Sequence, residues 1–293
     1  MVLKHIFQRT LTNNIYNSWL QFKAWYRYIV PGQSSIKVMP PSEYNLVFED
    51  RFNGDRIDSS EWRFGQPWGN FHTEQLWWYW PETDSCAKTS EDGLNLSLCL
   101  NPRVFVKNQL PEWKRSKKLP EVWTGSWCAG LISTKKAYQF GWFEAEIMIP
   151  TDFMQWSAFW LAGQDSWPPE IDIFETYYAD EQLWVKPNVH FGNAGTWKDG
   201  KRDMGQPLIP LANPADRWIK YACHWTEDWI RFYYDGYLVY EMTIPMALKQ
   251  NAHEQYIILN NGCENPAELG FDPAESGMLV RNLKVYQHKN WID

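Results

Sequence analysis

Residues 230–240 read Ile-Arg-Phe-Tyr-Tyr-Asp-Gly-Tyr-Leu-Val-Tyr, and they indicate the class of fold. Apolar and polar side chains alternate on both sides of Asp235-Gly236, a dipeptide typical of two-residue β-hairpin turns. Several other stretches have strand character: residues 94–98, 143–147, 257–259 and 279–286. Short strands separated by Gly, Pro and Asn turns, from Tyr44 onward, predict an all-β antiparallel sandwich.

The composition is ordinary for a globular protein except in its aromatic residues. Charged residues make up 22% and hydrophobic residues 44%, with a net charge of −7 that argues against nucleic acid or an anionic membrane as the main partner. Tryptophan, at 20 of 293 residues, exceeds what a core needs. Because exposed indoles are usually avoided, the excess predicts a groove for a ligand with flat apolar faces, such as sugar rings.

The first 43 residues differ from the rest of the chain. Six apolar residues recur there at helical spacing: Leu11, Ile15, Trp19, Phe22, Tyr26 and Ile29. Residues 10–29 are therefore expected to form a helix, either docked on the main domain or contacting a partner or a membrane surface. Pro31-Gly32 ends it, and a linker follows. We predict a helical extension over 1–43 and one β domain over 44–293.

Targeting and cysteine signals are few. The N-terminal stretch has no continuous apolar segment of signal-peptide length, and no run approaches the roughly 20 apolar residues of a membrane span. No Sec signal is thus expected, and the compartment stays open, with extracellular or periplasmic action possible by another export route. The five cysteines contain no CxxC motif, which predicts mostly buried thiols without a zinc site and leaves one disulfide open.

The segment from Glu170 to Glu175, Glu-Ile-Asp-Ile-Phe-Glu, carries the predicted chemistry. Alternation along a strand places Glu170 and Asp172 on one face. Glu175 lies an odd number of residues from Glu170, so an unbroken strand would turn it into the core, where an unpaired carboxylate is costly. One β-bulge between Asp172 and Glu175 would bring all three acids onto one face.

Three neighbouring carboxyl groups cannot all ionise cheaply at neutral pH. Their mutual repulsion raises at least one pKa, so one group keeps a proton while another is ionised. A protonated acid beside a carboxylate is what cleavage of a glycosidic bond requires. By itself the motif also fits a solvent-facing strand edge or a calcium site.

In its order of motifs the chain resembles glycoside hydrolase family 16, whose signature includes Glu-x-Asp-x-x-Glu. The similarity runs from about Tyr44 to Gln287. Besides the acidic strand it includes residues 48–54, 60–62, 130–134, 141–145, 158–161, 188–191, 225–236 and 280–287. The resemblance implies a β-jelly-roll sandwich of two curved antiparallel sheets, with a polysaccharide bound along a concave cleft.

The resemblance also implies roles for the acids. Glu170 would be the nucleophile, Glu175 the acid/base, and Asp172 a hydrogen-bond partner of the nucleophile in a retaining mechanism without cofactor. Many relatives carry a calcium-binding Asp where this chain has Arg281, so no structural calcium is expected. We expect Arg281 to pair instead with an acid such as Glu49 or Asp50.

Several aromatic residues are candidates for sugar binding. Trp160 and Trp167 lie near the acids in sequence, and each is expected either to stack on a sugar or to pack in the core. The resemblance places His190 beside the acid/base, with a structural histidine as the alternative. Trp68, Trp77 and Trp78 lie in a loop-like stretch, for which we expect at least one sugar platform.

The substrate stays open at this point. The resemblance implies that the bulged motif disfavours mixed-linkage lichenases and xyloglucan transglycosylases, whose motif is shorter, and it leaves open β-1,3-glucan and the marine-type β-galactans agar, porphyran and carrageenan. Residues 103–118 hold six basic residues and one acid, which fits either a solvated loop or a subsite for an anionic polymer. The function predicted is endo-acting cleavage of internal β-linkages. The alternative is a non-catalytic glycan-binding protein on the same scaffold.

Overall fold

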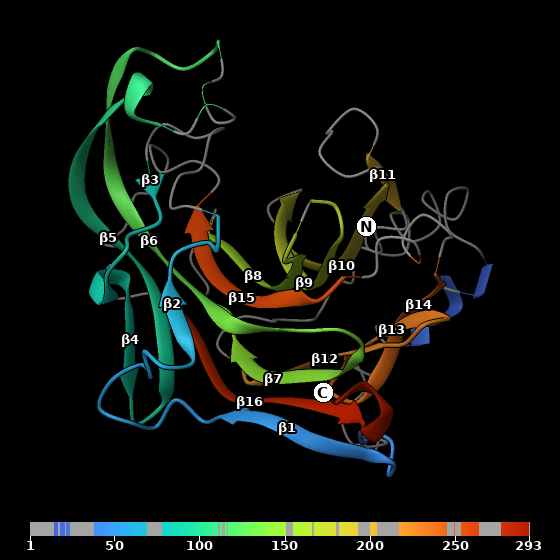
Figure 1. Ribbon diagram of the computed structural model, residues 1–293. Helices are drawn as coiled ribbons and strands as arrows, with labels where there is room; N and C mark the ends of the chain where they lie inside the picture. Colours follow the sequence, from blue (N-terminus) through green and yellow to red (C-terminus); the bar gives the residue numbers. More distant parts are fainter. Residues whose placement is uncertain are drawn as a thin grey trace.

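The computed structural model is built almost entirely of β-strands (Figure 1). It describes residues 15–16, 18–20, 22–23, 38–68, 78–110, 112, 115, 117–150, 155–165, 167–179, 182–192, 200–203, 217–244, 249, 253–263 and 277–292.

The strands form two stacked layers. One layer, called the site layer below, runs in the order β11 (Gly200–Asp203), β10 (Gln182–Gly192), β9 (Glu170–Ala179), β8 (Gln155–Gly163), β15 (Gln255–Cys263) and β6 (Val122–Tyr138), with β2 (Trp62–Phe64) also on β6. In Figure 1 this layer bends upward at both ends, so its outer face is concave. The antiparallel sandwich predicted from the alternating strands is confirmed, and so are the curved jelly-roll layers that the resemblance implies.

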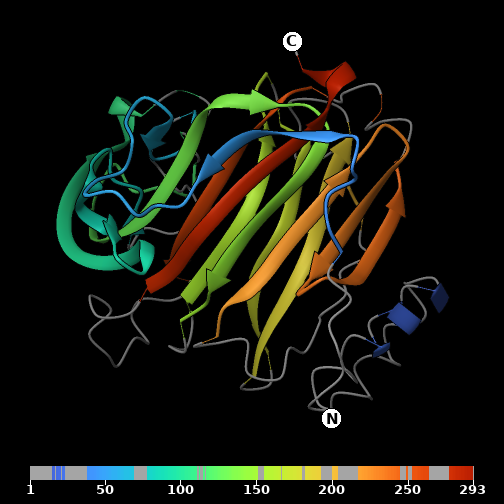
Figure 2. The same ribbon diagram turned by 90° about the horizontal axis from the view of Figure 1, so that it is seen from below.

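The opposite layer covers the inner face of the site layer. It runs in the order β5 (Gly93–Val106), β16 (Gly277–His288), β7 (Gly141–Met148), β12 (Ile219–Trp225), β13 (Trp229–Tyr234) and β14 (Tyr237–Thr243), with β1 (Tyr44–Asp50) on β16 and β4 (Ala87–Ser90) on β5. Figure 2 shows this layer from below, with β16 in red beside β7 in green. Its strands are antiparallel, as predicted.

Strands β5 and β6 join the two layers. The first half of β5 pairs with β16, and its second half pairs with the first half of β6. The rest of β6 then pairs with β15 in the site layer. The short strand β3 (Trp78–Tyr79) lies parallel to β6 and is a departure from the antiparallel pattern.

The hairpin predicted at Asp235-Gly236 is present. Tyr234 pairs with Tyr237, and both turn residues have positive φ, 48° for Asp235 and 82° for Gly236. Glycine reaches this left-handed region without steric cost, and Asp tolerates it better than most residues. Ile230, Phe232 and Tyr234 of the hairpin pack into the main hydrophobic core between the layers.

The N-terminal helix is confirmed in part. Residues 15–16, 18–20 and 22–23 are helical. Ile15 is 82% exposed and Trp19 is 53% exposed, whereas Leu20 is buried. Docking on the main domain, one of the two predicted alternatives, therefore does not involve Ile15 or Trp19. Leu11, Tyr26 and Ile29 of the stripe lie outside the described residues. Among the described residues, no helix combines the length and apolar character that a membrane crossing requires.

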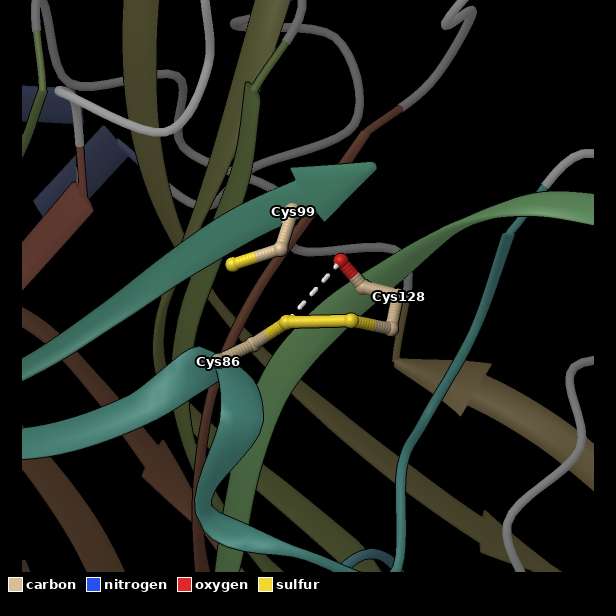
Figure 3. Close-up of side chains that lie close together, drawn as sticks. All are labelled: Cys86, Cys99 and Cys128. Atoms are coloured by element: carbon tan, nitrogen blue, oxygen red, sulfur yellow. Dashed lines mark hydrogen bonds between the residues drawn. A yellow bond between two sulfur atoms is a disulfide. The ribbon is translucent and has the colours of Figure 1, made fainter. Parts of the chain in front are cut away.

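The cysteines are largely buried, as expected, and one disulfide is present. It joins Cys86, in the short 3-10 helix Asp84–Cys86, to Cys128 on β6. Cys99 on β5 lies directly opposite Cys128, with its thiol beside the disulfide (Figure 3). Cys223 and Cys263 are buried free thiols.

Arg281 on β16 does not pair with Glu49 or Asp50. Its Nε lies 2.8 Å from Oε2 of Glu146, the residue opposite it on β7, and its guanidinium stacks 4.0 Å from the Trp218 ring. Asp50 instead accepts hydrogen bonds from the backbone of Phe52 and the indole of Trp62. The expected partner was wrong because the register of β16 with β7, rather than with β1, places the nearest acid.

Candidate active site

The β-bulge predicted in the acidic strand is present. On β10, Lys186 and Asn188 are two residues apart, but their partners on β9, Glu175 and Asp172, are three apart. The pairing of β9 with β8 shifts at the same place. The additional residue on β9 corrects the phase of Glu175, so that it joins Glu170 and Asp172 on one face.

That face is the outer, concave face of the site layer. The side chains of Glu170, Asp172 and Glu175 are 17%, 8% and 20% exposed, respectively. Ile171, Ile173 and Phe174 between them are fully buried in the core shared by the layers. The three acids therefore form a partly desolvated cluster backed by an apolar layer.

Glu170, at the start of β9, makes two polar contacts. The indole Nε1 of Trp167 donates to its Oε2 over 2.7 Å, and Nε2 of His190 lies 3.2 Å from its Oε1. Burial and then the charge of Asp172 raise the pKa of Glu170 to about 8, although His190 and the Trp167 hydrogen bond partly offset them. Trp167 thus reaches the predicted nucleophile as a hydrogen-bond donor.

Asp172 lies beside Glu170 and shares its histidine. Its Oδ2 is 3.4 Å from Nε2 of His190, which also lies 2.9 Å from the Asn188 amide nitrogen. Burial and then the charge of Glu175 hold the pKa of Asp172 well above its usual value, while the charge of Lys186 lowers it. Since both pKa values are raised, Glu170 and Asp172 retain a proton between them at neutral pH.

His190 was expected beside the acid/base, and this placement is wrong. Opposite Glu170 on β10, it contacts Glu170 and Asp172 instead. The ligand atoms of these three side chains lie within 4.8 Å of one another, a spacing that suits a metal ion as well as a shared proton.

Glu175 has different surroundings. Its Oε1 accepts a hydrogen bond of 2.9 Å from the indole of Trp156, and its Oε2 lies 3.1 Å from Nζ of Lys186. Sequence reasoning missed Trp156, Lys186 and Asn188. Lys186 lies directly across the β9–β10 ladder from Glu175, a relation that follows from the sequence only once the bulge and the register of that ladder are known.

The candidate aromatic platforms divide into two groups. Trp160 and Trp68 are partly buried and meet edge to face with ring centres 6.1 Å apart, and the indole of Trp160 donates to Oδ1 of Asn260 over 2.8 Å. Trp78 is only 1% exposed and donates its indole N–H to the carbonyl of Cys263, so it packs in the core rather than offering a face to a sugar. Trp77 lies outside the described residues.

Three basic residues of the segment 103–118 make contacts within the protein. Lys107 pairs with Glu121 over 3.0 Å, and Nε of Arg115 donates to the carbonyl of Leu110. The guanidinium of Arg103 stacks on the rings of Tyr79 and Phe105. These contacts favour the solvated-loop interpretation for the three cations.

A comparison of the sequence with protein-family models gives a result that is consistent with the three acids, the bulge and the sandwich fold. The model for glycosyl hydrolases family 16 matches residues 66–258, which include all three acids. The chain belongs to this family. The resemblance predicted from the order of motifs is confirmed.

Individual family 16 relatives are distant. Glucan endo-1,3-beta-glucosidase A1 of Niallia circulans is 25% identical over 235 residues, 73% of this chain and 32% of the relative. Endo-1,3-1,4-beta-glycanase ExsH of Rhizobium meliloti (strain 1021) is 30% identical over 164 residues, 54% of this chain and 33% of the relative. The chain spans about a third of the length of these curated relatives.

The solved structure of SCLam, a non-specific endo-beta-1,3(4)-glucanase from family 16, has the same fold. It aligns with a TM-score of 0.65 at 21% identity, over 92% of this chain and 99% of that one.

Proposed function

We propose that this family 16 chain is an endo-acting, retaining β-glycanase. The observation that carries the proposal is the bulge in β9, which brings three carboxyl groups onto one concave face and gives them different partners. Two of them share a raised pKa and a histidine, and the third contacts an ammonium group. Acid and base roles in glycosidases are separated by such differences in environment.

The roles that the family resemblance implies require Asp172 to hold the shared proton and Glu175 to be protonated when the substrate binds. When Asp172 holds the proton that it shares with Glu170, Glu170 is a carboxylate able to attack the anomeric carbon. Glu175 then donates a proton to the leaving glycosidic oxygen, and a covalent glycosyl-enzyme forms. In the second step Glu175 takes a proton from water, which attacks the anomeric carbon and releases Glu170.

We propose a β-1,3-glucan as the substrate. The names of the curated relatives and of SCLam, each an enzyme acting on 1,3- or mixed 1,3- and 1,4-linked β-glycans, support this choice. The pair formed by Trp160 and Trp68 would supply a stacking surface for a sugar ring. Lys107, Arg115 and Arg103 already contact other groups of the protein. This argues against an anionic polymer as the main substrate.

A reducing-end assay on laminarin, lichenan, agarose, porphyran and carrageenan tests the proposal. We expect activity on laminarin that falls by about three orders of magnitude or more in Glu170→Gln and Glu175→Gln. Glu144→Gln, on the opposite layer, is the matched control. Activity on another polymer alone would overturn the substrate, and full activity in either acid variant would overturn the roles.

Binding without release of reducing ends would favour the non-catalytic alternative. Activity on porphyran or carrageenan that falls steeply with salt would instead assign the basic segment to substrate binding.

A further inference from the structure

Lys186 faces Glu175 across the β9–β10 ladder. Its Nζ lies 3.1 Å from Oε2, and the two side chains are 13% and 20% exposed. The other oxygen, Oε1, accepts the indole N–H of Trp156. Each oxygen of the carboxylate thus contacts a donor, and a partly buried ion pair of this kind is screened by solvent less than a surface pair.

The charges around the three acids are therefore unequal. Glu170 and Asp172 face each other and His190, and burial raises the pKa of both. Glu175 faces Asp172 and, more weakly, Glu170 on its own strand, Lys186 on β10 and the neutral Trp156 on β8. The ammonium of Lys186 acts on both sides of the bulge, because it also lowers the pKa of Asp172.

We propose that Lys186 is a positioning residue that holds Glu175 as a carboxylate in the second half of the reaction, when Glu175 must accept a proton. The proposal rests on the acid/base role proposed above for Glu175. In the first half, Glu175 gives its proton to the glycosidic oxygen as the C–O bond breaks, and the new carboxylate gains Lys186 as its counter-ion. In the second half, the carboxylate takes a proton from the attacking water.

The pH dependence of kcat/KM reports the essential acid and base of the free enzyme, so it tests the effect of the Lys186 charge on these groups before the glycosyl-enzyme forms. Lys186→Met keeps the aliphatic stem and removes the charge, so both limbs of the profile should move to higher pH by about one unit. Lys186→Arg keeps the charge and should stay within a few tenths of a unit of the wild type. The substrate is whichever glycan of the panel the wild type cleaves.

Lys220→Met is the matched control. Lys220 also pairs with a buried glutamate, Glu144, at 3.4 Å, but on the opposite layer. The pH profile of kcat/KM in Lys220→Met should be the same as in the wild type. An unchanged profile in Lys186→Met, or an equal shift in Lys186→Arg, would overturn the proposal.

A measurement on the free protein separates this proposal from the proposed function. In protein with ¹³C-labelled glutamate carboxyl groups, the Glu175 signal is assigned by its loss in Glu175→Gln. We expect this signal to titrate at higher pH in Lys186→Met than in the wild type, whether or not any glycan is cleaved. Identical titration curves would overturn the role of Lys186 and leave the proposed glycanase activity standing. If Lys186→Met does not fold, Lys186→Gln takes its place.

Discussion

The indole of Trp167 donates a hydrogen bond of 2.7 Å to Oε2 of Glu170, three residues further along the chain. The ring of Trp167 also lies beside that of His190, with ring centres 5.9 Å apart. The indole of Trp167 therefore contacts one oxygen of the proposed nucleophile, and Nε2 of His190 contacts the other. Because the indole N–H donates to Glu170, it favours negative charge on Glu170 when Glu170 and Asp172 share a proton.

Trp167→Phe should raise the pKa of Glu170 further, because the Trp167 hydrogen bond stabilises its ionised form. We expect the acidic limb of the kcat/KM profile to move up by about one pH unit and the maximum rate to fall by about tenfold. The measurement is a pH–rate series on the cleaved glycan. Trp229→Phe, on the opposite layer, is the control, and equal profiles for the two variants would contradict the donor role of Trp167.

Glu170→Gln should make the protein more stable than the wild type at alkaline pH. The pKa of Glu170 is about 8 in the folded protein, above its usual value of 4.5, so folding favours the protonated form. The wild type therefore loses stability as the pH rises from about 4.5 to about 8, whereas the glutamine variant lacks this loss. Allowing for the coupling to Asp172, we expect a difference of about 1–3 kcal/mol at pH 8.

Urea unfolding at pH 4.5 and pH 8 measures this difference. Asp228→Asn, an exposed carboxylate paired with Lys249, is the control and should follow the wild type. If Glu170→Gln and the wild type have parallel stability curves between these pH values, the raised pKa of Glu170 is wrong.

Trp160→Ala should weaken substrate binding, whereas Trp78→Ala should reduce folding stability. Trp160 is partly buried near Trp68, so its loss should raise KM by about tenfold and leave the melting temperature nearly unchanged. Trp78 is fully buried, and its loss should cost about 3–5 kcal/mol of folding stability. Thermal unfolding and laminarin kinetics of both variants give the comparison. A large stability loss in Trp160→Ala with unchanged KM would assign it to packing.

The disulfide between Cys86 and Cys128 should stabilise the protein. It closes a loop with a sequence separation of 42, for which chain entropy predicts about 4 kcal/mol. Urea unfolding with and without a phosphine reductant measures the effect. Without reductant, thiol counting in denaturant should find three free cysteines, Cys99, Cys223 and Cys263.

Cys86→Ser/Cys128→Ser should not respond to the reductant, and Cys99→Ser should respond as the wild type does. Five titratable thiols in the untreated protein would show that the bond does not form.

The sequence predicted those features that depend on local period. Alternation along Glu170–Glu175 and an odd spacing were enough to predict the bulge, because a carboxylate cannot be buried cheaply among isoleucines. The hairpin at Asp235-Gly236 followed from turn chemistry in the same way.

Features that depend on long-range pairing were missed. Trp78 looked exposed in a stretch rich in Gly, His and Pro, but β3, to which it belongs, pairs with β6, and its ring packs in an apolar cluster with Trp80 and Trp156. The partner of Arg281 is set by the register of two strands more than 130 residues apart, and the partner of Glu175 by the register of β9 with β10. No local pattern contains either register.

In a regular strand, the spacing of Glu170 and Glu175 along the chain decides which face each acid occupies. The bulge in β9 removes this dependence. In a regular strand, any change in the number of residues between Glu170 and Glu175 that is not a multiple of two turns one acid inward. With an adjustable extra residue, the spacing of the two acids can vary by single residues while the isoleucine face keeps its packing. A change of one residue in the spacing of the proposed nucleophile and acid/base is therefore compatible with the same sandwich beneath them.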